Sequence, residues 1–327
     1  VALLIAAALI SQIALAEQQG SGGVNAPEQR DKPYIVLVSI DGFRWDFPDL
    51  TDTPAMNRMA ANGIRAEALQ PAFPTLTFPN HFSIATGMLP RTHGVVANEF
   101  PNEERSHWYH YKDRSTVQDG DWYQVDPIWV TAEKQGMVTA AYFFVGTEAD
   151  ISGIRPTHWR AFNAEDSDER RVSQVLAWLA EPPETRPHLI TLYTEDVDDH
   201  SHWHGPGSAE SIAAIQRVDR RLQQLLDGIA GLPHGDQVYV FLVSDHGQAA
   251  YDSSKAPLVL DDLADLEGVR AVEGGPYVHL YFQQDDPERV RQVQDAINQS
   301  WDCGRALLPG EAPTAWAISA SRRYPDL

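Results

Sequence analysis

Unbroken runs of apolar and β-branched residues recur along the chain and predict buried strands. A strand with one face in water alternates apolar and polar residues, whereas an unbroken run is typical of a strand covered on both faces, as in a parallel sheet. The runs are "YIVLVSI", "TAAYFF", "HLITLYT" and "QVYVFLVS", at residues 34–40, 139–144, 188–194 and 237–244. They predict a mostly parallel central sheet.

Segments with helical start and stop signals lie between these runs. Thr53 and Pro54 form an N-cap followed by Pro at the first helical position, and Gly63 closes the same segment. Helices are expected over residues 54–63 and 127–136, over residues 211–231 from an apolar stripe at helical spacing, and, after the last run, over about 286–301. Alternating strands and helices predict an α/β fold, with helices on both faces of the sheet.

The first sixteen residues, "VALLIAAALISQIALA", form an apolar run that ends in Ala14-Leu15-Ala16, an A-x-A-type cleavage signal. The run is shorter than the roughly 20 residues that a membrane span needs. Residues 1–16 are therefore expected to be part of a signal peptide, with a membrane anchor or a buried helix as alternatives. We expect a polar leader at residues 17–32, one domain over residues 33–327, no membrane span after cleavage, and a periplasmic or secreted protein.

Charge and cysteine content narrow the classes of partner. The net charge of the 327 residues is -21, and Lys and Arg form no dense run, which argues against a nucleic-acid duplex as partner because phosphate backbones require cationic neutralisation. A small anion can still bind if a metal ion supplies positive charge. Cys303 is the only cysteine, so the chain forms no internal disulfide and no cysteine metal cluster. The sequence gives no indication of the oligomeric state.

Acidic and imidazole side chains follow three of the expected strands directly. Asp41 follows the first, the stretch "TEDVDDHSHWHGP" overlaps and follows the third, and Asp245 with His246 follows the fourth. Because ligands of open α/β sheets bind beyond the carboxyl ends of the strands, we expect these groups to converge. Mixed Asp and His ligands suit zinc, manganese or iron better than calcium or magnesium.

Spacing selects among the carboxylates and histidines of this crowded stretch. Asp198 and His202 are four residues apart, so one helical turn can direct both at one ion. Glu195 and Asp196 come directly after the strand and are expected to orient ligands or cap the turn. His204 precedes Gly205-Pro206 and is expected at the surface.

A second segment offers a hydroxyl at the start of a helix. In "PTLTFPNHFSIATGM" a buried helix is expected after Thr77-Phe78-Pro79-Asn80. Helix starts favour anions, because their backbone N–H groups and the positive end of the dipole point outward. Thr77 is either an N-cap or, beside a metal ion that lowers the pKa of its hydroxyl, a nucleophile.

Four motifs together carry a resemblance to a known family. "SIDGFR", "PTLTFPNHFSIATG…HGVVAN", "LYTEDVDDHSHWHGP" and "VSDHG" occur in an order and spacing that resemble the nucleotide pyrophosphatase/phosphodiesterases of the alkaline phosphatase superfamily. The resemblance implies an alkaline-phosphatase-like fold and zinc-dependent hydrolysis of nucleotide 5′-phosphodiesters and pyrophosphates. It further implies a covalent phospho-threonine intermediate, release of nucleoside 5′-monophosphate, and a small nucleotide as substrate.

The same resemblance implies two Zn²⁺ ions and a role for each matching residue. Thr77 is then the nucleophile and Asn98 donates a hydrogen bond to the phosphate, while Phe78 and Tyr193 hold the base or another apolar leaving moiety. Core packing is the alternative for the two aromatic rings. The residues that match metal ligands are Asp41, Thr77, Asp245 and His246 for one ion and Asp198 and His202 for the other.

One departure concerns the second zinc. The family supplies a further histidine from a G-T-H-G-type stretch near the C-terminus, whereas this sequence ends in "RRYPDL". The later His279 stands in "GGPYVHLYF" and is expected to be a strand histidine. We therefore expect the catalytic domain of residues 33–327 to be incomplete at the C-terminus. Residues 17–327 alone are expected to bind the second zinc weakly and hydrolyse diesters slowly; stoichiometric two-zinc binding with robust hydrolysis would contradict this.

Three alternative functions remain open at the level of sequence. Two belong to the same superfamily: a lipid-headgroup (choline-releasing) phosphodiesterase and a phosphomonoesterase. The third is a catalytically silent homologue that binds nucleotide or metal. A sulfatase is disfavoured because no Cys or Ser stands in a C/S-x-P-S-R context.

Overall fold

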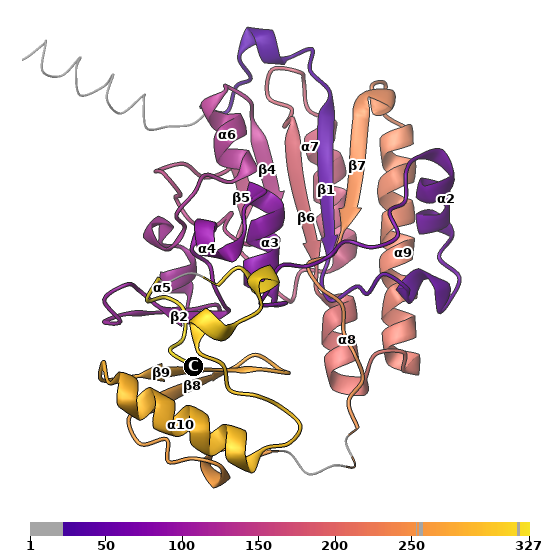
Figure 1. Cartoon of the computed structure of the whole chain (residues 1–327). Coiled ribbons are helices and arrows are strands. Elements are labelled where there is room, and N and C mark those ends of the chain that lie inside the picture. Colours follow the sequence, from indigo (N-terminus) through magenta and orange to yellow (C-terminus); the bar gives the residue numbers. More distant parts are fainter. Residues whose placement is uncertain (1–21, 253, 255–257, 319–320) are drawn as a thin grey trace, which may run out of the picture.

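A five-stranded parallel sheet forms the centre of the larger of two lobes (Figure 1). The computed structural model describes residues 22–252, 254, 258–318 and 321–327, so the expected signal peptide at residues 1–16 lies outside the described residues. The strand order is β5-β4-β6-β1-β7 and every pairing is parallel. The strands are β1 (Tyr34–Ile40), β4 (Thr139–Tyr142), β5 (His158–Arg160), β6 (Leu189–Thr194) and β7 (Val238–Val243).

The register of the three strands β6, β1 and β7 brings their carboxyl ends level. Ile40 pairs with Thr194, and Ser39 pairs with Val243. The residues that follow these strands therefore leave the sheet side by side, at its lower edge in Figure 1. The sheet thus places three of the expected acidic segments next to one another.

Helices cover both faces of the sheet, as expected from the sequence. On one face, α3 (Thr77–Thr86) contributes Phe82 to a cluster with Leu37 of β1. On the other, α7 (Asp168–Leu179) and α9 (Ala209–Ala230) pack on Val36 and Val38, because successive strand side chains point to opposite faces. The remaining helices of this lobe are α2 (Pro54–Asn62), α4 (Pro90–His93), α5 (Arg114–Val117), α6 (Ile128–Lys134) and α8 (Asp196–His204).

One helix boundary and one strand differ from expectation for local reasons. The helix α3 begins at Thr77 itself, and Pro79 is accommodated within its first turn, where a proline N–H is not required. The strand β5 was not expected, since three residues are too few to produce a recognisable apolar pattern. The other expected strands and helices are present, with ends displaced by at most two residues.

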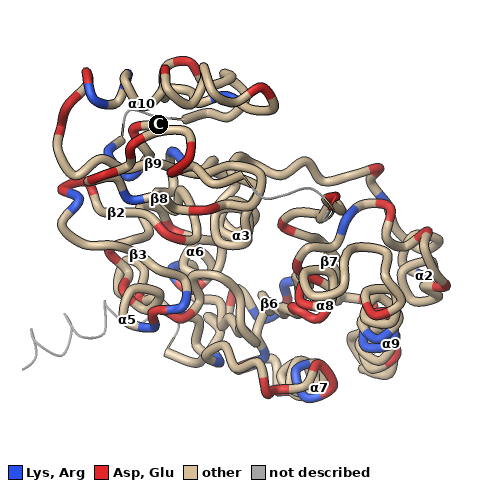
Figure 2. Tube along the Cα trace, turned by 90° about the horizontal axis from the view of Figure 1, so that it is seen from below, with Lys and Arg blue, Asp and Glu red and all other residues tan. Residues whose placement is uncertain are grey.

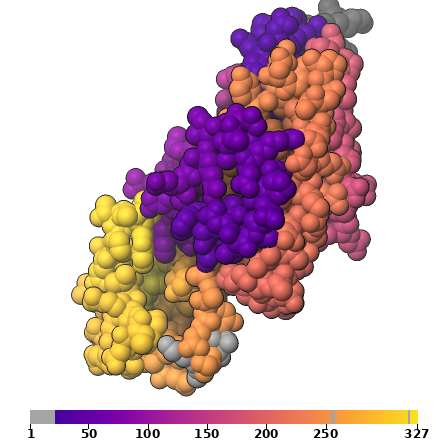
Figure 3. All heavy atoms as spheres, turned by 90° about the vertical axis from the view of Figure 1, so that its right-hand side faces the viewer, coloured from indigo at the N-terminus to yellow at the C-terminus, as the bar shows by residue number. Residues whose placement is uncertain are grey.

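A smaller lobe lies beneath the sheet lobe, drawn in orange and yellow in Figures 1 and 3. Its antiparallel pair, β8 (Val269–Glu273) and β9 (Val278–Phe282), packs against α10 (Pro287–Ser300) around a separate apolar cluster that includes Leu327. The sequence range expected to form one domain therefore contains two lobes, and the smaller lobe has an apolar cluster of its own. A short antiparallel pair, β2 (Glu99–Pro101) and β3 (Trp108–His110), belongs to neither sheet. Single 3₁₀ turns occupy Pro27–Gln29, Phe47–Asp49, Gly120–Trp122, Gly235–Gln237, Leu260–Asp262, Pro309–Glu311 and Thr314–Trp316.

The described part of the polar leader, residues 22–32, is docked on the domain. The Asn25 side chain is buried, donates to the carbonyl oxygens of Pro183 and Arg186, and accepts from the Val138 N–H at 2.7 Å. A polar composition predicted a linker, but one amide that satisfies three backbone groups fixes this segment in place.

The described residues also bear on charge and membrane contact. Figure 2 shows acidic residues gathered around α8, at the edge of the sheet where the strands end.

Among the described residues, no helix combines the length and apolarity that crossing a bilayer would take.

Candidate metal centre

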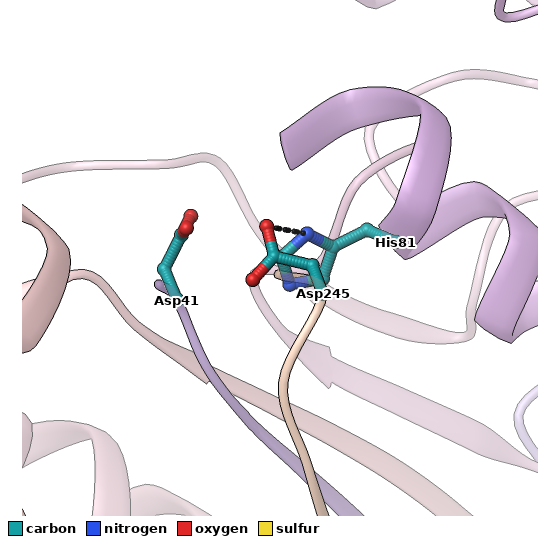
Figure 4. A group of neighbouring side chains, drawn as sticks. All are labelled: Asp41, His81 and Asp245. Atoms are coloured by element: carbon teal, nitrogen blue, oxygen red, sulfur yellow. Dashed lines mark ion pairs between the residues drawn. The ribbon is translucent and has the colours of Figure 1, made fainter. Parts of the chain in front are cut away.

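The carboxyl edge of the sheet collects the residues that the sequence singled out. Ligand atoms of Asp41, Asp198 and His246 lie within 4.8 Å of one another, and those of Asp41, His81 and Asp245 form a second such group (Figure 4). Asp41 follows β1 directly, and Asp245 stands two residues after β7. Convergence of these strand ends is therefore observed.

The His246 imidazole lies at the middle of the first expected ligand set. Its Nε2 atom is 3.5 Å from Asp41 Oδ1, 3.2 Å from Asp245 Oδ2 and 3.4 Å from the Thr77 hydroxyl. The four side chains come from β1, α3 and the segment after β7, so only the folded chain brings them together. A hydroxyl, an imidazole and two carboxylates around one point form a mixed oxygen and nitrogen donor set.

The two carboxylates are buried, and one oxygen of each has no hydrogen bond among the described residues. Asp41 and Asp245 are 1% and 2% exposed, and among the described residues neither Oδ1 of Asp41 nor Oδ2 of Asp245 accepts a hydrogen bond. Burial raises the pKa of Asp41 well above its usual value, as do the adjacent charges of Asp245 and Asp198. Burial acts in the same direction on Asp245, but His81 and His246 outweigh it and lower the pKa of that carboxyl. A divalent cation would satisfy both orphaned oxygens, so the residues fit a metal ion.

The second expected pair also meets. Asp198 and His202 are one turn apart on α8, with Oδ2 and Nε2 separated by 3.4 Å. Gly42 permits the approach of α8, since it has φ +64° and a Cβ there would lie 2.5 Å from Asp198 Oδ1. The Gln248 amide donates to Asp198. The His202 side chain is 68% exposed, so this pair faces solvent on one side.

Charge pairs fix the start of α8, as the position of its acidic residues suggested. Arg171 donates to both carboxylate oxygens of Glu195, at 2.6 and 2.8 Å. Arg217 contacts both oxygens of Asp196, at 2.8 and 2.7 Å. Bidentate pairs of this kind set direction as well as distance. His204 is exposed, as expected.

Thr77 is the first residue of α3, not its N-cap. The cap position is Leu76, and no side chain caps this helix. The capping alternative for Thr77 is therefore wrong, because the helix begins one residue earlier than that alternative requires. Its hydroxyl points instead at His246 Nε2.

Asn98 lies beside the same helix start. The Phe78 N–H donates to Asn98 Oδ1 at 3.1 Å. Since an N–H can bond only to the amide oxygen, this contact fixes the orientation of the amide and leaves Nδ2 as its donor end.

The two aromatic residues expected to bind substrate are both packed in this structure. Phe78 is 7% exposed and its ring meets those of Tyr109 and Tyr111 edge to face. Tyr193 is 6% exposed, and its hydroxyl donates to Asp41 Oδ2 at 2.6 Å. Tyr193 thus contacts a candidate metal ligand, a role that its aromatic character alone did not indicate.

Replacing Tyr193 with phenylalanine separates these two roles. The variant keeps the ring and removes only the hydrogen bond to Asp41, so metal affinity should fall by about tenfold, with substrate KM nearly unchanged. Metal competition against a chromophoric chelator and steady-state kinetics provide the two measurements. Tyr239→Phe, at an exposed position on β7, serves as the control. A raised KM with unchanged metal affinity would instead assign Tyr193 to the substrate.

Two residues that contact candidate metal ligands, His81 and Gln248, were not singled out from the sequence. His81 stands four residues after Thr77, which puts both on one helix face, and Gln248 comes just after His246-Gly247. Helical spacing was the available signal for His81. His279 is a buried histidine of β9, a strand position as expected, and its ring lies 4.8 Å from that of Tyr277.

Comparison with known protein families gives one match over most of the chain. A family model described as type I phosphodiesterase / nucleotide pyrophosphatase matches residues 35–327. Ectonucleotide pyrophosphatase/phosphodiesterase family member 1 of Mus musculus is 34% identical over 250 residues, which is 76% of this chain and 28% of the mouse protein. Venom phosphodiesterase of Naja atra is 33% identical over 243 residues, covering 74% of this chain and 29% of its own length. The chain thus spans less than a third of the length of these relatives.

Solved structures show the same similarity in three dimensions. Murine ectonucleotide pyrophosphatase/phosphodiesterase 5 superposes with a TM-score of 0.82 at 25% identity, over 90% of this chain and 77% of that one. An inactive threonine-to-alanine variant of the same murine protein, in complex with AMP, matches equally well.

Proposed function

This chain belongs to the type I phosphodiesterase/nucleotide pyrophosphatase family, and we propose that it hydrolyses nucleotide 5′-phosphodiesters and pyrophosphates in a zinc-dependent reaction. The observation that carries the proposal is the position of the Thr77 hydroxyl. It lies at the start of a helix, 3.4 Å from His246 Nε2, beside two buried carboxylates with unpaired oxygens. A nucleophile, an anion-binding helix start and a cation site therefore share one edge of the sheet.

We assign two Zn²⁺ ions to this edge. The mixed oxygen and nitrogen donors favour zinc over calcium and magnesium, which take oxygen ligands almost alone. When bound, zinc supplies positive charge that lowers the pKa of a coordinated hydroxyl and stabilises charge on the phosphate. The residues that would hold the ions are Asp41, Thr77, Asp245 and His246 for one and Asp198 and His202 for the other.

Thr77 and Asn98 carry the chemical step in this proposal. Thr77 Oγ1 attacks phosphorus, the new Oγ1–P bond forms as the bond to the leaving-group oxygen breaks, and phospho-threonine results. Water then cleaves the P–Oγ1 bond, which restores Thr77 and releases nucleoside 5′-monophosphate. The N-terminal turn of α3 and Asn98 Nδ2 donate to non-bridging oxygens, where negative charge accumulates.

The nucleotide preference rests on the relatives and on the ring cluster near Thr77. The matching proteins are named as nucleotide pyrophosphatases and phosphodiesterases, and one neighbour holds AMP. Phe78 contacts Tyr111, which is partly exposed, so the ring cluster extends from the nucleophile's helix to the surface. We propose that a base binds against this cluster, with Tyr193 completing it from the metal side.

A substrate comparison tests the proposal directly. The full-length protein should hydrolyse p-nitrophenyl thymidine 5′-phosphate faster than p-nitrophenyl phosphate or p-nitrophenyl phosphocholine. Preference for the monoester would support a phosphomonoesterase, and preference for the choline ester would support a lipid-headgroup enzyme. Hydrolysis of none of the three, with zinc bound, would support a silent homologue. The proposed export to the periplasm or medium is tested by fractionating cells that express the natural gene.

Asn98→Ala tests the assigned donor. Removing one hydrogen-bond donor to developing charge typically costs about 10²–10³-fold in kcat. We expect a loss of this size with little change in KM, because the bond strengthens as charge accumulates. Asn62→Ala, at the exposed end of α2, is the matched control. A change in KM alone would assign Asn98 to ground-state binding.

A further inference from the structure

We infer that His81 is a positioning residue that holds Asp245 and the backbone of Thr77 in place, and that it does not bind metal itself. The inference rests on the proposed function, because it concerns an ion held at Asp41 and Asp245. It departs from the simplest interpretation of the geometry, in which Asp41, His81 and Asp245 are three ligands of one ion.

The His81 imidazole is fully buried and both of its nitrogens have partners, of which Figure 4 shows Asp245. Nε2 lies 2.8 Å from the Ser39 hydroxyl. Nδ1 lies 2.9 Å from the Thr77 carbonyl oxygen and 3.2 Å from Asp245 Oδ2. The ring therefore touches β1, the first turn of α3 and the segment after β7.

The partner at Nδ1 decides what that nitrogen can do. A carbonyl oxygen only accepts hydrogen bonds, so Nδ1 carries a proton and donates it to Thr77 O. A protonated ring nitrogen has no free lone pair for a metal ion. Asp245 Oδ2, 3.2 Å from the same nitrogen, makes no hydrogen bond of its own among the described residues, so its lone pairs stay available. The imidazole therefore lies close enough to hold this carboxylate in place and still leaves the Oδ2 lone pairs free for a metal ion.

The Nε2 atom of His81 also has a hydrogen-bond partner, the Ser39 hydroxyl. Ser39 is fully buried in β1, two residues before Asp41, and its hydroxyl faces the ring. Two aromatic rings pack edge to face against the imidazole and hold it in this orientation. Its ring centroid lies 5.1 Å from that of Phe144 and 5.3 Å from that of Tyr193. A ring that cannot turn fixes the distance between the helix that carries the nucleophile and the strand ends that carry the carboxylates.

His81→Ala and His81→Asn test this role through metal binding. An outer partner of a metal ligand typically contributes about 10–100-fold to metal affinity. Zinc affinity, measured by chelator competition, should fall by this factor in His81→Ala without loss of zinc stoichiometry. His81→Asn should recover part of the affinity, since its amide N–H can replace Nδ1–H. In the cobalt-substituted protein, His81→Asn should leave the positions of the visible absorption bands unchanged.

His188→Asn is the matched control. His188 is also a buried histidine with Nδ1 near a backbone carbonyl, but it lies at the opposite end of the sheet. Its substitution should leave zinc affinity unchanged. Ser39→Ala removes only the contact at Nε2 and should lower the affinity by a smaller factor, which keeps the test available if His81→Ala does not fold.

Two results would overturn the inference. Loss of a zinc equivalent together with shifted cobalt bands in His81→Asn would make His81 a ligand. Unchanged zinc affinity in His81→Ala, His81→Asn and Ser39→Ala would remove its positioning role. Absence of zinc binding in the wild-type protein would be a separate failure, because it contradicts the proposed metal and not the role of His81.

Discussion

Thr77→Ala is expected to reduce phosphodiester hydrolysis by at least about 10³-fold, because the reaction loses the atom that attacks phosphorus. The hydroxyl lies at the only point where the start of α3, His246 and the buried carboxylates meet among the described residues. Thr77→Ser keeps a hydroxyl and should retain measurable activity. The measurement is release of p-nitrophenol from p-nitrophenyl thymidine 5′-phosphate by the full-length protein.

The other end of the same helix provides a control for this loss. Thr86 donates to the carbonyl oxygen of Phe82 and lies about two and a half turns from Thr77. Thr86→Ala removes the same hydroxyl from the same helix and should keep activity near that of the wild type. Diester hydrolysis that survives in Thr77→Ala would show that another group attacks phosphorus.

Removal of zinc is expected to lower both activity and stability. An ion present at 100 times its dissociation constant stabilises the folded state by about 2.7 kcal/mol, which for a chain of this length corresponds to a melting temperature about 4 °C higher. The physical reason is the neutralisation of Asp41 and Asp245, whose orphaned oxygens lie together in the interior. Thermal melts with chelator and with added zinc measure the difference.

Asp41→Asn separates charge crowding from metal binding. Without metal the variant should be at least as stable as the wild type, because one of the adjacent buried carboxyls can no longer ionise. Added zinc should then raise its melting temperature by less than in the wild type, because only the ion assigned to Asp198 and His202 is left to bind. Asp49→Asn, which changes an exposed carboxylate near Arg65, should keep the full zinc-dependent shift. An Asp41 variant that keeps the full zinc-dependent shift would place the first ion elsewhere.

The local pattern was sufficient for four of the five strands of the sheet and for the convergence of acidic and histidine residues at their carboxyl ends. The runs of β1 and β6 are apolar on both faces because helices cover both sides of the sheet there. The run of β7 is also apolar, but this strand lies at the edge of the sheet and its Tyr239 and Phe241 side chains are exposed. Asp41 and Asp245 follow such runs directly. The i, i+4 spacing of Asp198 and His202 identified two neighbours on one helix turn, and the structure places them 3.4 Å apart.

The direction in which a side chain points, and the group that it contacts, could not be predicted in the same way. The expected roles of Phe78 and Tyr193 came from the family resemblance, yet Tyr193 directs its hydroxyl at Asp41. Asn25 was expected in a linker, yet its amide is buried against backbone groups more than a hundred residues away. Each contact joins segments that are distant in sequence, so no local pattern records it.

The sequence by itself determined the α/β fold, the helical covering of both sheet faces, and the acidic and histidine residues placed at the strand ends. Only the tertiary structure decided that His81 joins Ser39, Thr77 and Asp245. It also decided that the cap of α3 is Leu76, which leaves the Thr77 hydroxyl for His246. The physical reason is the distance along the chain over which each effect acts. Apolar runs and helical spacing relate residues that are close in sequence, whereas the direction of a buried polar group depends on the distant segment that packs against it.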